Sequence, residues 1–472
     1  MTAVLHKPPT EQEFMAAWPA YESTRPLDVL RQTDYARLDR LGHIYLDYTG
    51  AGLYASSQVL QHAGLLESHV FGNPHSRNPT SATITDRIEQ GRRKVLAYFS
   101  ASEDEYVAIF TANASQALKL VGEAYPFSSG GHYLLTFDNH NSVNGIREFA
   151  RARGTSITYV PLSLPEMRVD EDTLDRHLTL AQPGGPNLFA YPAQSNFSGV
   201  QHPLEWIARA KAMGWDVLLD AAAFVPIHRL DLSEWHPDFV TISFYKMFGY
   251  PTGVGCLLAR REALGKLRRP WFAGGTITVA SVQGDRYFLA EGASAFEDGT
   301  PDYLGIPGVE TGLRHLEDVG LEMIHTRCRC LTAWLLQELL SLHHANGKPL
   351  VRVYGPLDTG RRGATVAMNL YNPEGRMIDH LRVEEAATER RISLRTGCFC
   401  NPGGGEIALR ISKPELIGCF SQHPQEDSRF TVDDFRHCVH SEGTGAVRVS
   451  LGIVSNFADV SRFVEFIREF LR

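Results

Sequence analysis

Cysteine is scarce in this sequence, and long apolar runs are missing from it. The seven cysteines among 472 residues are irregularly spaced, which is not the pattern of a disulfide-stabilised secreted protein. The first residues, MTAVLHKPPTEQEF, lack the apolar core of a signal peptide, and no stretch approaches the roughly 20 apolar residues of a membrane helix. These absences predict a cytoplasmic protein with reduced thiols and without a membrane segment.

A strong charge of either sign is also lacking. The net charge of −8 gives no reason to expect nucleic acid or an anionic membrane as a partner. Hydrophobic residues make up 43% of the chain and charged residues 21%, as in ordinary soluble globular proteins. A chain of 472 residues is too long for one small core, so we expect two domains.

Short apolar segments alternate with amphipathic ones between about residues 43 and 260. Helical periodicity is found in 114–124, 143–153 and 203–213. Such alternation predicts an α/β fold: a mainly parallel sheet between helices, with sites at the carboxyl ends of the strands. The candidate strands are 106–110, 132–137, 156–162, 187–192, 215–220, 238–244 and 253–259.

The pattern changes after about residue 310, where a smaller α+β unit is expected. We predict three domains or segments: an N-terminal arm over 1–42, a large domain over 43–310 and a small domain over 311–472. The polar segment 421–435 is predicted to be a loop. Elements expected in the small domain are helices at 320–344, 376–390 and 457–471, and strands at 365–371, 392–397 and 446–454.

Three strand ends carry residue types that suit one flat, charged ligand. In FTANASQALKL, a helix starts near Ala114 and Ser115, where free N–H groups bind phosphate, although such residues are more often simple caps. Asp220 ends the strand in LLDAAAF, where it is either a cap or the partner of a protonated ring nitrogen. His140, in DNHNSVNG, is placed to stack on a ring, to cap a helix or to pack in the core.

Lys246 follows the next strand directly, in TISFYKMFGYPTG. A single lysine is usually a solvated surface residue, but the apolar neighbours of this one favour the neutral amine that a Schiff base needs. An aspartate at one strand end and a lysine just after the next are typical of pyridoxal-phosphate enzymes. These enzymes also need a helix start for the phosphate.

The stretch RTGCFCNPGGGE places two cysteines after an arginine. Zinc would need further ligands at compact spacing, and Cys419 and Cys438 lie too irregularly to supply them, so we expect no metal site. A thiol near Arg395 would have a lowered pKa, and the glycines after it predict a mobile loop. Cys400 is the candidate nucleophile, a buried role fits Cys398 better, and Cys256, Cys328 and Cys330 are expected to pack in the interior.

These motifs resemble those of a known family. The chain is similar to the fold-type I, class V pyridoxal-phosphate enzymes, the cysteine desulfurases and their relatives, and most of all to the N-terminal part of molybdenum cofactor sulfurases. The segments that carry the resemblance are YLDYTGAGLY (45–54), FGNPHS (71–76), FTANASQALKLVGEAYPF (110–127), DNHNSVNG (138–145), PAQSNFSGV (192–200), DAAAF (220–224), SFYKMFGYPTGVG (243–255), GGT (274–276), RTGCFCNPG (395–403) and VRVSLG (447–452).

The resemblance implies a role for each residue of a cofactor and substrate site. Arg395 would bind the substrate carboxylate, and Cys400 would accept the sulfur. The cofactor pyridoxal 5′-phosphate would be held covalently by Lys246, with Asp220 at its ring nitrogen, His140 stacked on its ring and Asn196 bonded to its phenolic oxygen. Its phosphate would be held by Ala114, Ser115 and Ser243 of the same chain and by Thr276 of the neighbouring subunit.

The implied enzyme is a homodimeric L-cysteine desulfurase that passes sulfur to an acceptor protein. The alternatives are a C–S lyase or aminotransferase-type enzyme acting on another amino acid, and a scaffold without activity. Tyr245 and Ala223 replace a histidine and a glutamine of many desulfurases, so proton-transfer details are not carried over. Since the sequence ends where the C-terminal acceptor domain of the sulfurases would begin, the resemblance does not predict sulfuration of the molybdenum cofactor.

Overall fold

The fold is built around a seven-stranded sheet with the order β2-β8-β7-β6-β5-β3-β4. The computed structural model describes residues 10–421, 430–439 and 443–471. Strand β8 is antiparallel to both of its neighbours, and all other pairs are parallel, so the mainly parallel α/β sheet is confirmed. The strands are β2 (Tyr106–Thr111), β3 (His132–Thr136), β4 (Ser156–Val160), β5 (Asn187–Pro192), β6 (Asp216–Asp220), β7 (Phe239–Ser243) and β8 (Gly255–Arg260).

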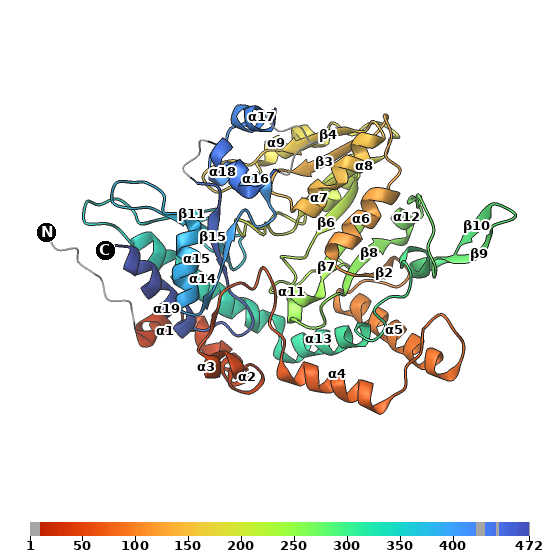
Figure 1. Ribbon diagram of the computed structural model, residues 1–472, viewed down its shortest axis with the longest axis horizontal. Helices are drawn as coiled ribbons and strands as arrows, with labels where there is room; N and C mark the ends of the chain where they lie inside the picture. The colour runs from red at the N-terminus through yellow and green to blue at the C-terminus, as the bar shows by residue number, and fades with distance from the viewer. Residues whose placement is uncertain (1–9, 422–429, 440–442, 472) are drawn as a thin grey trace.

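Every one of these strands matches a predicted segment, because strands covered on both faces consist of nearly continuous apolar residues. Helices α6, α7 and α8 lie together over one face of the sheet, while α5 and α13 lie below it in Figure 1. The helices of this part are α4 (Ser56–Ser68), α5 (Pro79–Tyr98), α6 (Ala114–Ala124), α7 (Asn141–Asn144), α8 (Ile146–Ala152), α9 (Glu171–Leu178), α10 (Trp206–Ala212), α11 (Phe244–Phe248), α12 (Arg261–Leu264) and α13 (Ile306–Val319).

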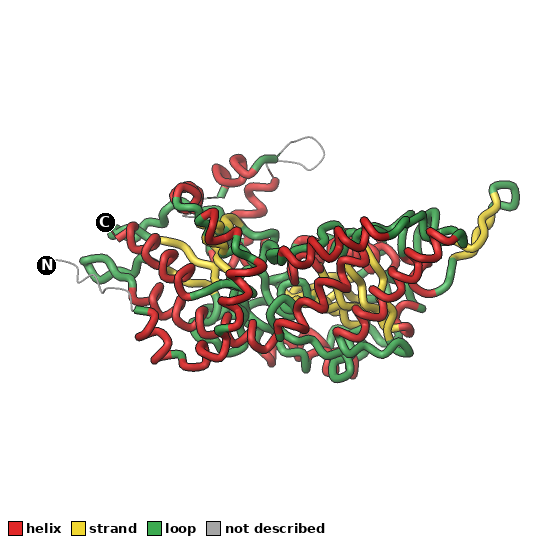
Figure 2. Tube along the Cα trace, turned by 90° about the horizontal axis from the view of Figure 1, so that it is seen from below, coloured by secondary structure: helices red, strands yellow, loops and turns green. Residues whose placement is uncertain are grey.

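A hairpin of β9 (Ile277–Ser281) and β10 (Arg286–Leu289) projects away from the body, as Figures 1 and 2 both show. The short helix η2 (Gly292–Phe296) follows it. The side chains of the hairpin are largely exposed, including Val279 and Phe288 in the strands and Val282 just after β9. None of the helices in the described part of the chain has an apolar stretch long enough to span a bilayer.

The smaller unit contains a four-stranded sheet with the order β11-β12-β15-β14. A separate two-stranded pairing joins β1 (Ile44–Tyr45) to β13 (Ile392–Ser393), which brings the segments after both strands close together. The other elements are β11 (Val351–Tyr354), β12 (Thr365–Leu370), β14 (Arg395–Gly397), β15 (Ala446–Ser450), α14 (Leu321–Ser341), α15 (His380–Glu389), α16 (Pro402–Ala408), α17 (Lys413–Ser421), α18 (Val432–Cys438), α19 (Phe457–Arg468) and η3 (Glu469–Leu471).

Two predictions for the segment after Ser412 are wrong. The loop predicted over 421–435 contains the start of helix α18, which Thr431 caps through the backbone N–H of Asp434, while 422–429 lie outside the described residues. The expected reduced thiols are wrong for one pair, since Cys419 and Cys438 form a disulfide with an S–S distance of 2.06 Å. Two short helices bring these cysteines together across a separation of 19 residues, which spacing alone does not reveal.

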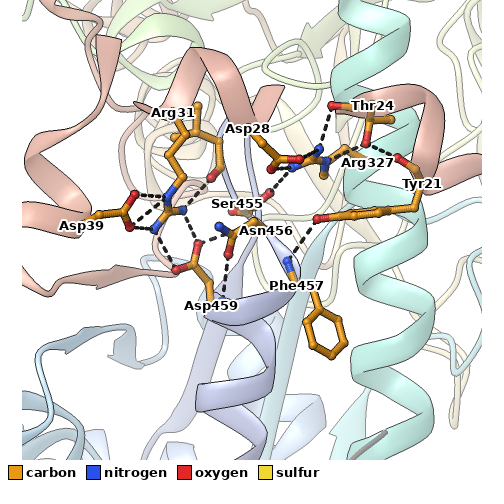
Figure 3. A network of polar contacts seen from close by, with 11 residues as sticks. Tyr21, Thr24, Asp28, Arg31, Asp39, Arg327, Ser455, Asn456, Phe457 and Asp459 are labelled. Carbon is orange, nitrogen blue, oxygen red and sulfur yellow. Dashed lines mark hydrogen bonds and ion pairs between the residues drawn. The ribbon is translucent and has the colours of Figure 1, made fainter. Parts of the chain in front are cut away.

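The N-terminal segment forms helices that pack on the small unit (Figure 3). Arg327 of α14 bonds Asp28 at 2.6 and 2.9 Å and the hydroxyl and carbonyl oxygens of Thr24 at 2.6 and 2.7 Å. Arg31 pairs with Asp459 of α19 at 2.5 Å. The segment contains α1 (Glu11–Ala17), η1 (Pro19–Thr24), α2 (Pro26–Asp34) and α3 (Arg37–Leu41), and the proposed boundaries 1–42, 43–310 and 311–472 stay a prediction.

The pair of Arg327 and Asp28 predicts a cost for losing its carboxylate. The Arg327 side chain is fully buried and that of Asp28 is 36% exposed, so Asp28→Ala leaves a buried guanidinium without its counterion. We expect the free energy of unfolding to fall by about 2 kcal/mol in urea titrations, less than for a wholly buried pair. Glu22→Ala is the control, because its exposed pair with Arg25 contributes at most about 0.5 kcal/mol. Equal losses in both variants would contradict the prediction.

Candidate active site

A cavity of about 360 Å³ opens at the carboxyl ends of the central strands. Six residues predicted from the sequence line it together, although they come from four separate segments of the chain. The six are Ala114, Ser115, His140, Asp220, Ser243 and Lys246.

The start of helix α6 forms one end of this cavity. The side chain of Asn113 caps the helix by accepting a hydrogen bond from the N–H of Gln116 at 2.9 Å. The N–H groups of the first helical residues, Ala114 and Ser115, have no partner inside the helix, and they lie at the positive end of the helix dipole. Strand β8 passes so close that a Cβ on Gly255 would lie 2.5 Å from the Asn113 backbone. The geometry suits a phosphate group.

Lys246 enters the cavity from helix α11, which begins directly after β7. Burial lowers the pKa of its amine, Asp220 opposes this effect, and the positive charge of Arg448 lowers the pKa further. The result favours the neutral amine, which is the form that reacts with an aldehyde.

Asp220 and His140 both line this cavity. Asp220 is the last residue of β6 and accepts a hydrogen bond from the N–H of Ala222 at 3.0 Å. Nδ1 of His140 accepts a hydrogen bond from the N–H of Ser142 at 3.1 Å, which assigns any ring proton to Nε2. Burial lowers the pKa of His140, so its ring is neutral and suited to stacking.

Asn196 does not line this cavity, but it is bonded to the segment that carries Cys400. The side-chain N–H of Asn196 donates to the carbonyl of Phe399 at 2.8 Å, and Asn401 donates to Oδ1 of Asn196 at 2.9 Å. The backbone N–H of Asn141, next to His140, donates to the carbonyl of Cys400 at 2.7 Å. These bonds hold the cysteine segment against the residues that line the cavity.

The mobile glycine loop predicted after Cys400 is wrong. Gly403, Gly404 and Gly405 form the first turns of helix α16 and are buried. A Cβ on Gly403 would lie 1.9 Å from the carbonyl oxygen of Phe137, so glycine serves close packing of the helix on the large domain. The sequence alone does not distinguish a flexible glycine run from a tightly packed one.

Phe399 takes the buried position that was predicted for Cys398. Its ring lies 5.2 Å from that of Phe197 and 4.7 Å from the guanidinium of Arg448, whereas Cys398 and Cys400 are both exposed. The predicted buried role of Cys398 is therefore wrong. The interior positions of Cys256, Cys328 and Cys330 are confirmed. Among the described residues, no cluster of three His, Cys, Asp or Glu side chains could hold a metal ion.

Two arginines lie near Lys246, and sequence reasoning gave a role to only one. The side chain of Arg395 is half exposed and bonds Oδ2 of Asp47 at 3.0 and 2.6 Å. Arg448 is buried and bonds Oδ1 of Asp47 and the carbonyl of Asn196 at 3.0 and 2.9 Å. Of these two, Arg448 has the larger influence on the pKa of Lys246. Both Asp47 and Arg448 lie in segments that carried the family resemblance.

Tyr245 lines the cavity, whereas Thr276 and Ala223 do not. Thr276 precedes β9, and its hydroxyl donates to the carbonyl of Ala273 at 2.9 Å. It does not line the cavity of its own chain and is fully buried there, so a contact with a neighbouring subunit would need this segment to rearrange and stays a prediction. Burial raises the pKa of Tyr245, which is consistent with a neutral phenol at that position.

Asn401 is expected to matter for stability because it donates two hydrogen bonds from a buried position. Its Nδ2 donates to the carbonyl of Asp138 at 2.7 Å and to Asn196, while its Oδ1 caps α16. Asn401→Asp keeps the cap but sets a carboxylate against two acceptors, so we expect a loss of about 2 kcal/mol in urea unfolding. Asn78→Asp, the same change at the exposed cap of α5, is the control and should be nearly neutral. A neutral Asn401→Asp variant would show that the two acceptors do not depend on this donor.

The strand-end lysine, the aspartate of the neighbouring strand and the helix start define a pyridoxal-phosphate site of the fold-type I kind. The Aminotransferase class-V family matches residues 44–463, and the chain belongs to this family. Membership confirms the predicted fold type, the pyridoxal 5′-phosphate cofactor and the prediction of an enzyme.

The curated relatives support the resemblance to the sulfurases. The molybdenum cofactor sulfurase of Arabidopsis thaliana is 35% identical over 94% of this chain and 58% of its own length. The molybdenum cofactor sulfurase of Homo sapiens is 36% identical over 93% of this chain and 50% of its own length. The chain thus spans about half the length of the curated relatives it matches.

Solved structures support the fold. The apo cysteine desulfurase of Thermococcus onnurineus NA1 has a TM-score of 0.75 at 24% identity, and covers 94% of this chain and 98% of its own. The cysteine desulfurase CsdA of Escherichia coli has a TM-score of 0.73 at 19% identity, with coverage of 94% and 98%. The cystine C–S lyase C-DES, in complex with cysteine persulfide, has a TM-score of 0.67 at 18% identity, with coverage of 90% and 97%.

Proposed function

We propose that the chain is a pyridoxal-phosphate-dependent L-cysteine desulfurase that forms alanine and a persulfide on Cys400. The observation that carries this proposal is the attachment of the Cys400 segment to the cofactor cavity. The carbonyl of Cys400 accepts from Asn141, beside His140, and the Phe399 carbonyl accepts from Asn196. Cys400 also lies close enough to Lys246 to influence the pKa of its amine. The relatives named cysteine desulfurase and molybdenum cofactor sulfurase support the same reaction class.

The residues of the cavity fit the cofactor that the family implies. The start of α6 and Ser243 would hold its phosphate, and Lys246 would hold its aldehyde carbon. Asp220 would keep the ring nitrogen protonated, His140 would stack on the ring, and Asn196 would donate to the phenolic oxygen. When bound, the cofactor supplies an electron sink that acidifies the α-carbon of the substrate.

The residues of the chain supply binding, proton transfer and the sulfur acceptor. Arg395 and Arg448 would bind the substrate carboxylate. The neutral amine of Lys246 would take the α-proton of cysteine. The Cys400 thiolate would attack the substrate sulfur, forming a new S–S bond while the carbon–sulfur bond breaks. The electron pair of that bond stays on the β-carbon, which a proton then converts to the methyl group of alanine.

A product assay tests this function. Purified holoenzyme with L-cysteine is expected to yield alanine together with an equal amount of protein persulfide in the first turnover. Pyruvate and ammonia in place of alanine would instead identify a C–S lyase, which is the second candidate. This candidate is supported by the similarity of the fold to that of the cystine C–S lyase C-DES. The absence of any product would favour an inactive scaffold.

The enzyme is proposed to act as a homodimer, with the β9–β10 hairpin at the subunit interface. The exposed apolar side chains of the β9–β10 hairpin support this, because such patches mark interaction surfaces. Val282 is fully exposed and Phe288 is 62% exposed. Light scattering should give twice the 52.5 kDa mass of the chain, and Phe288→Asp should lower it.

The sulfur on Cys400 is proposed to pass to an acceptor protein. Support comes from the exposure of Cys400, which leaves the thiol open to another molecule.

A further inference from the structure

Asp47 occupies a position between the two arginines proposed to bind the substrate. One oxygen of its carboxylate bonds Arg395, and the other bonds Arg448. A Cβ on Gly50 would lie 2.4 Å from the Asp47 oxygen and 2.7 Å from the Arg395 guanidinium. The tight turn that follows Asp47 therefore needs glycine to leave room for this ion pair.

The arrangement is buried and incomplete in its hydrogen bonding. The side chains of Asp47 and Arg448 are 10% and 2% exposed. Among the described residues, no group accepts a hydrogen bond from Nε of Arg448. The two guanidiniums therefore keep donors for a further anion after Asp47 has taken its share.

The charges around Asp47 can be counted. Two guanidiniums and one carboxylate leave a single positive charge while the Cys400 thiol keeps its proton, and burial lowers the pKa of the nearby Lys246 amine. Asp220 and the start of α6 line the neighbouring cavity, where they would serve the ring nitrogen and the phosphate, so neither is included in this count. One positive charge matches one substrate carboxylate, and it leaves no partner for a second anionic group.

We propose that Asp47 is a specificity-determining residue that restricts the substrate to amino acids with an uncharged side chain. The proposal rests on the function given above, because it concerns the same carboxylate site. Asp47 neutralises one arginine permanently, so an amino acid with a second carboxylate or sulfinate would bind a site of insufficient positive charge. Cysteine, with its neutral thiol, fits the remaining charge.

The test compares two probes in the holoenzyme. Dissociation constants of L-alanine and L-aspartate are measured from the absorbance change of the bound cofactor. Asp47→Asn raises the net charge by one, and the preference for aspartate over alanine is expected to rise on the order of tenfold or more. An unchanged ratio, or equal shifts for both probes, would overturn the proposal. A purely structural role for Asp47 would move both constants together.

A charge-restoring variant separates electrostatics from damage to the fold. The double variant Asp47→Asn, Arg395→Gln returns the site to one positive charge, and it is expected to restore the original ratio. If Asp47→Asn does not fold, Arg395→Gln alone should shift the ratio in the opposite direction, toward alanine. A ratio unaffected by Arg395→Gln would overturn the proposal.

Two controls complete the design. Asp28→Asn removes a carboxylate from a buried arginine outside the cavity, so it should lower stability without changing the ratio. The cofactor-free protein provides a second readout, in which succinate should raise the melting temperature more than propionate only in Asp47→Asn. Failure of the desulfurase function would appear separately, as absence of alanine from L-cysteine in the unmodified enzyme.

Discussion

Replacing Lys246 with methionine is expected to abolish turnover of L-cysteine. The variant loses the amine that would hold the cofactor and take the α-proton, and loss of the proton-transfer role alone costs about 10²–10⁴-fold. Covalent attachment is checked by borohydride treatment, which should fix pyridoxal 5′-phosphate to the unmodified chain and not to the variant. Lys266→Met, at a half-exposed lysine paired with Asp216, is the matched control and should keep its activity. Fixation of the cofactor in Lys246→Met would contradict the assignment.

The same substitution should stabilise the cofactor-free protein at neutral pH. Burial lowers the pKa of Lys246, so the folded chain binds the lysine proton more weakly than the unfolded chain. Stability from this group is therefore lowest below the folded pKa, and it recovers as pH rises toward the unfolded value of about 10.4. Lys246→Met removes the cost, so we expect its melting temperature to exceed that of the unmodified apoprotein by several degrees at pH 7. The difference should shrink toward pH 10, and a constant difference would contradict this explanation.

The second large effect is expected at Cys400. Cys400→Ala should lower alanine formation by on the order of 10³-fold or more, as removal of a nucleophile does in other enzymes, and it should eliminate the protein persulfide. Cofactor binding should persist, because the backbone of residue 400, and not its thiol, bonds Asn141. Cys398→Ala is the matched control, since Cys398 is also exposed and lies two residues away. We expect that variant to retain most of its activity.

The outcomes at these cysteines separate the candidate functions. Unchanged alanine formation in Cys400→Ala would reject the persulfide step. Equal losses in both variants would mean that the two thiols share the role. Pyruvate formation that does not depend on either cysteine would favour the C–S lyase.

Most of the seven-stranded sheet could be predicted because its signals are local. Continuous apolar runs such as 187–192 and 216–220 identify strands buried on both faces, and an aspartate that ends one strand or a lysine that closely follows another lies at a known edge of the sheet. Lys246 and Asp220 were found in this way. Short helices are harder to predict, since α18 begins inside a segment whose polar composition predicts a loop.

The residues that were missed depend on contacts between distant parts of the chain. Asp47 and Arg448 are 401 positions apart in sequence, and no local pattern marks them as partners. The buried position of Phe399 was not predicted, because the two cysteines beside it were considered only for their reactivity. Gly403, Gly404 and Gly405 led to the prediction of a mobile loop where the structure has a buried helix, because glycine permits both flexibility and close packing.

The packing of α16 has a consequence for how sulfur could leave the protein. With Gly403 against Phe137 and Phe399 inserted beside Phe197, residue 400 has little freedom to travel outward. A receiving molecule would have to bring its own reactive atom up to the rim of the cavity. We therefore expect recipients with a slender, protruding segment to be served better than those whose receiving group sits in a recess.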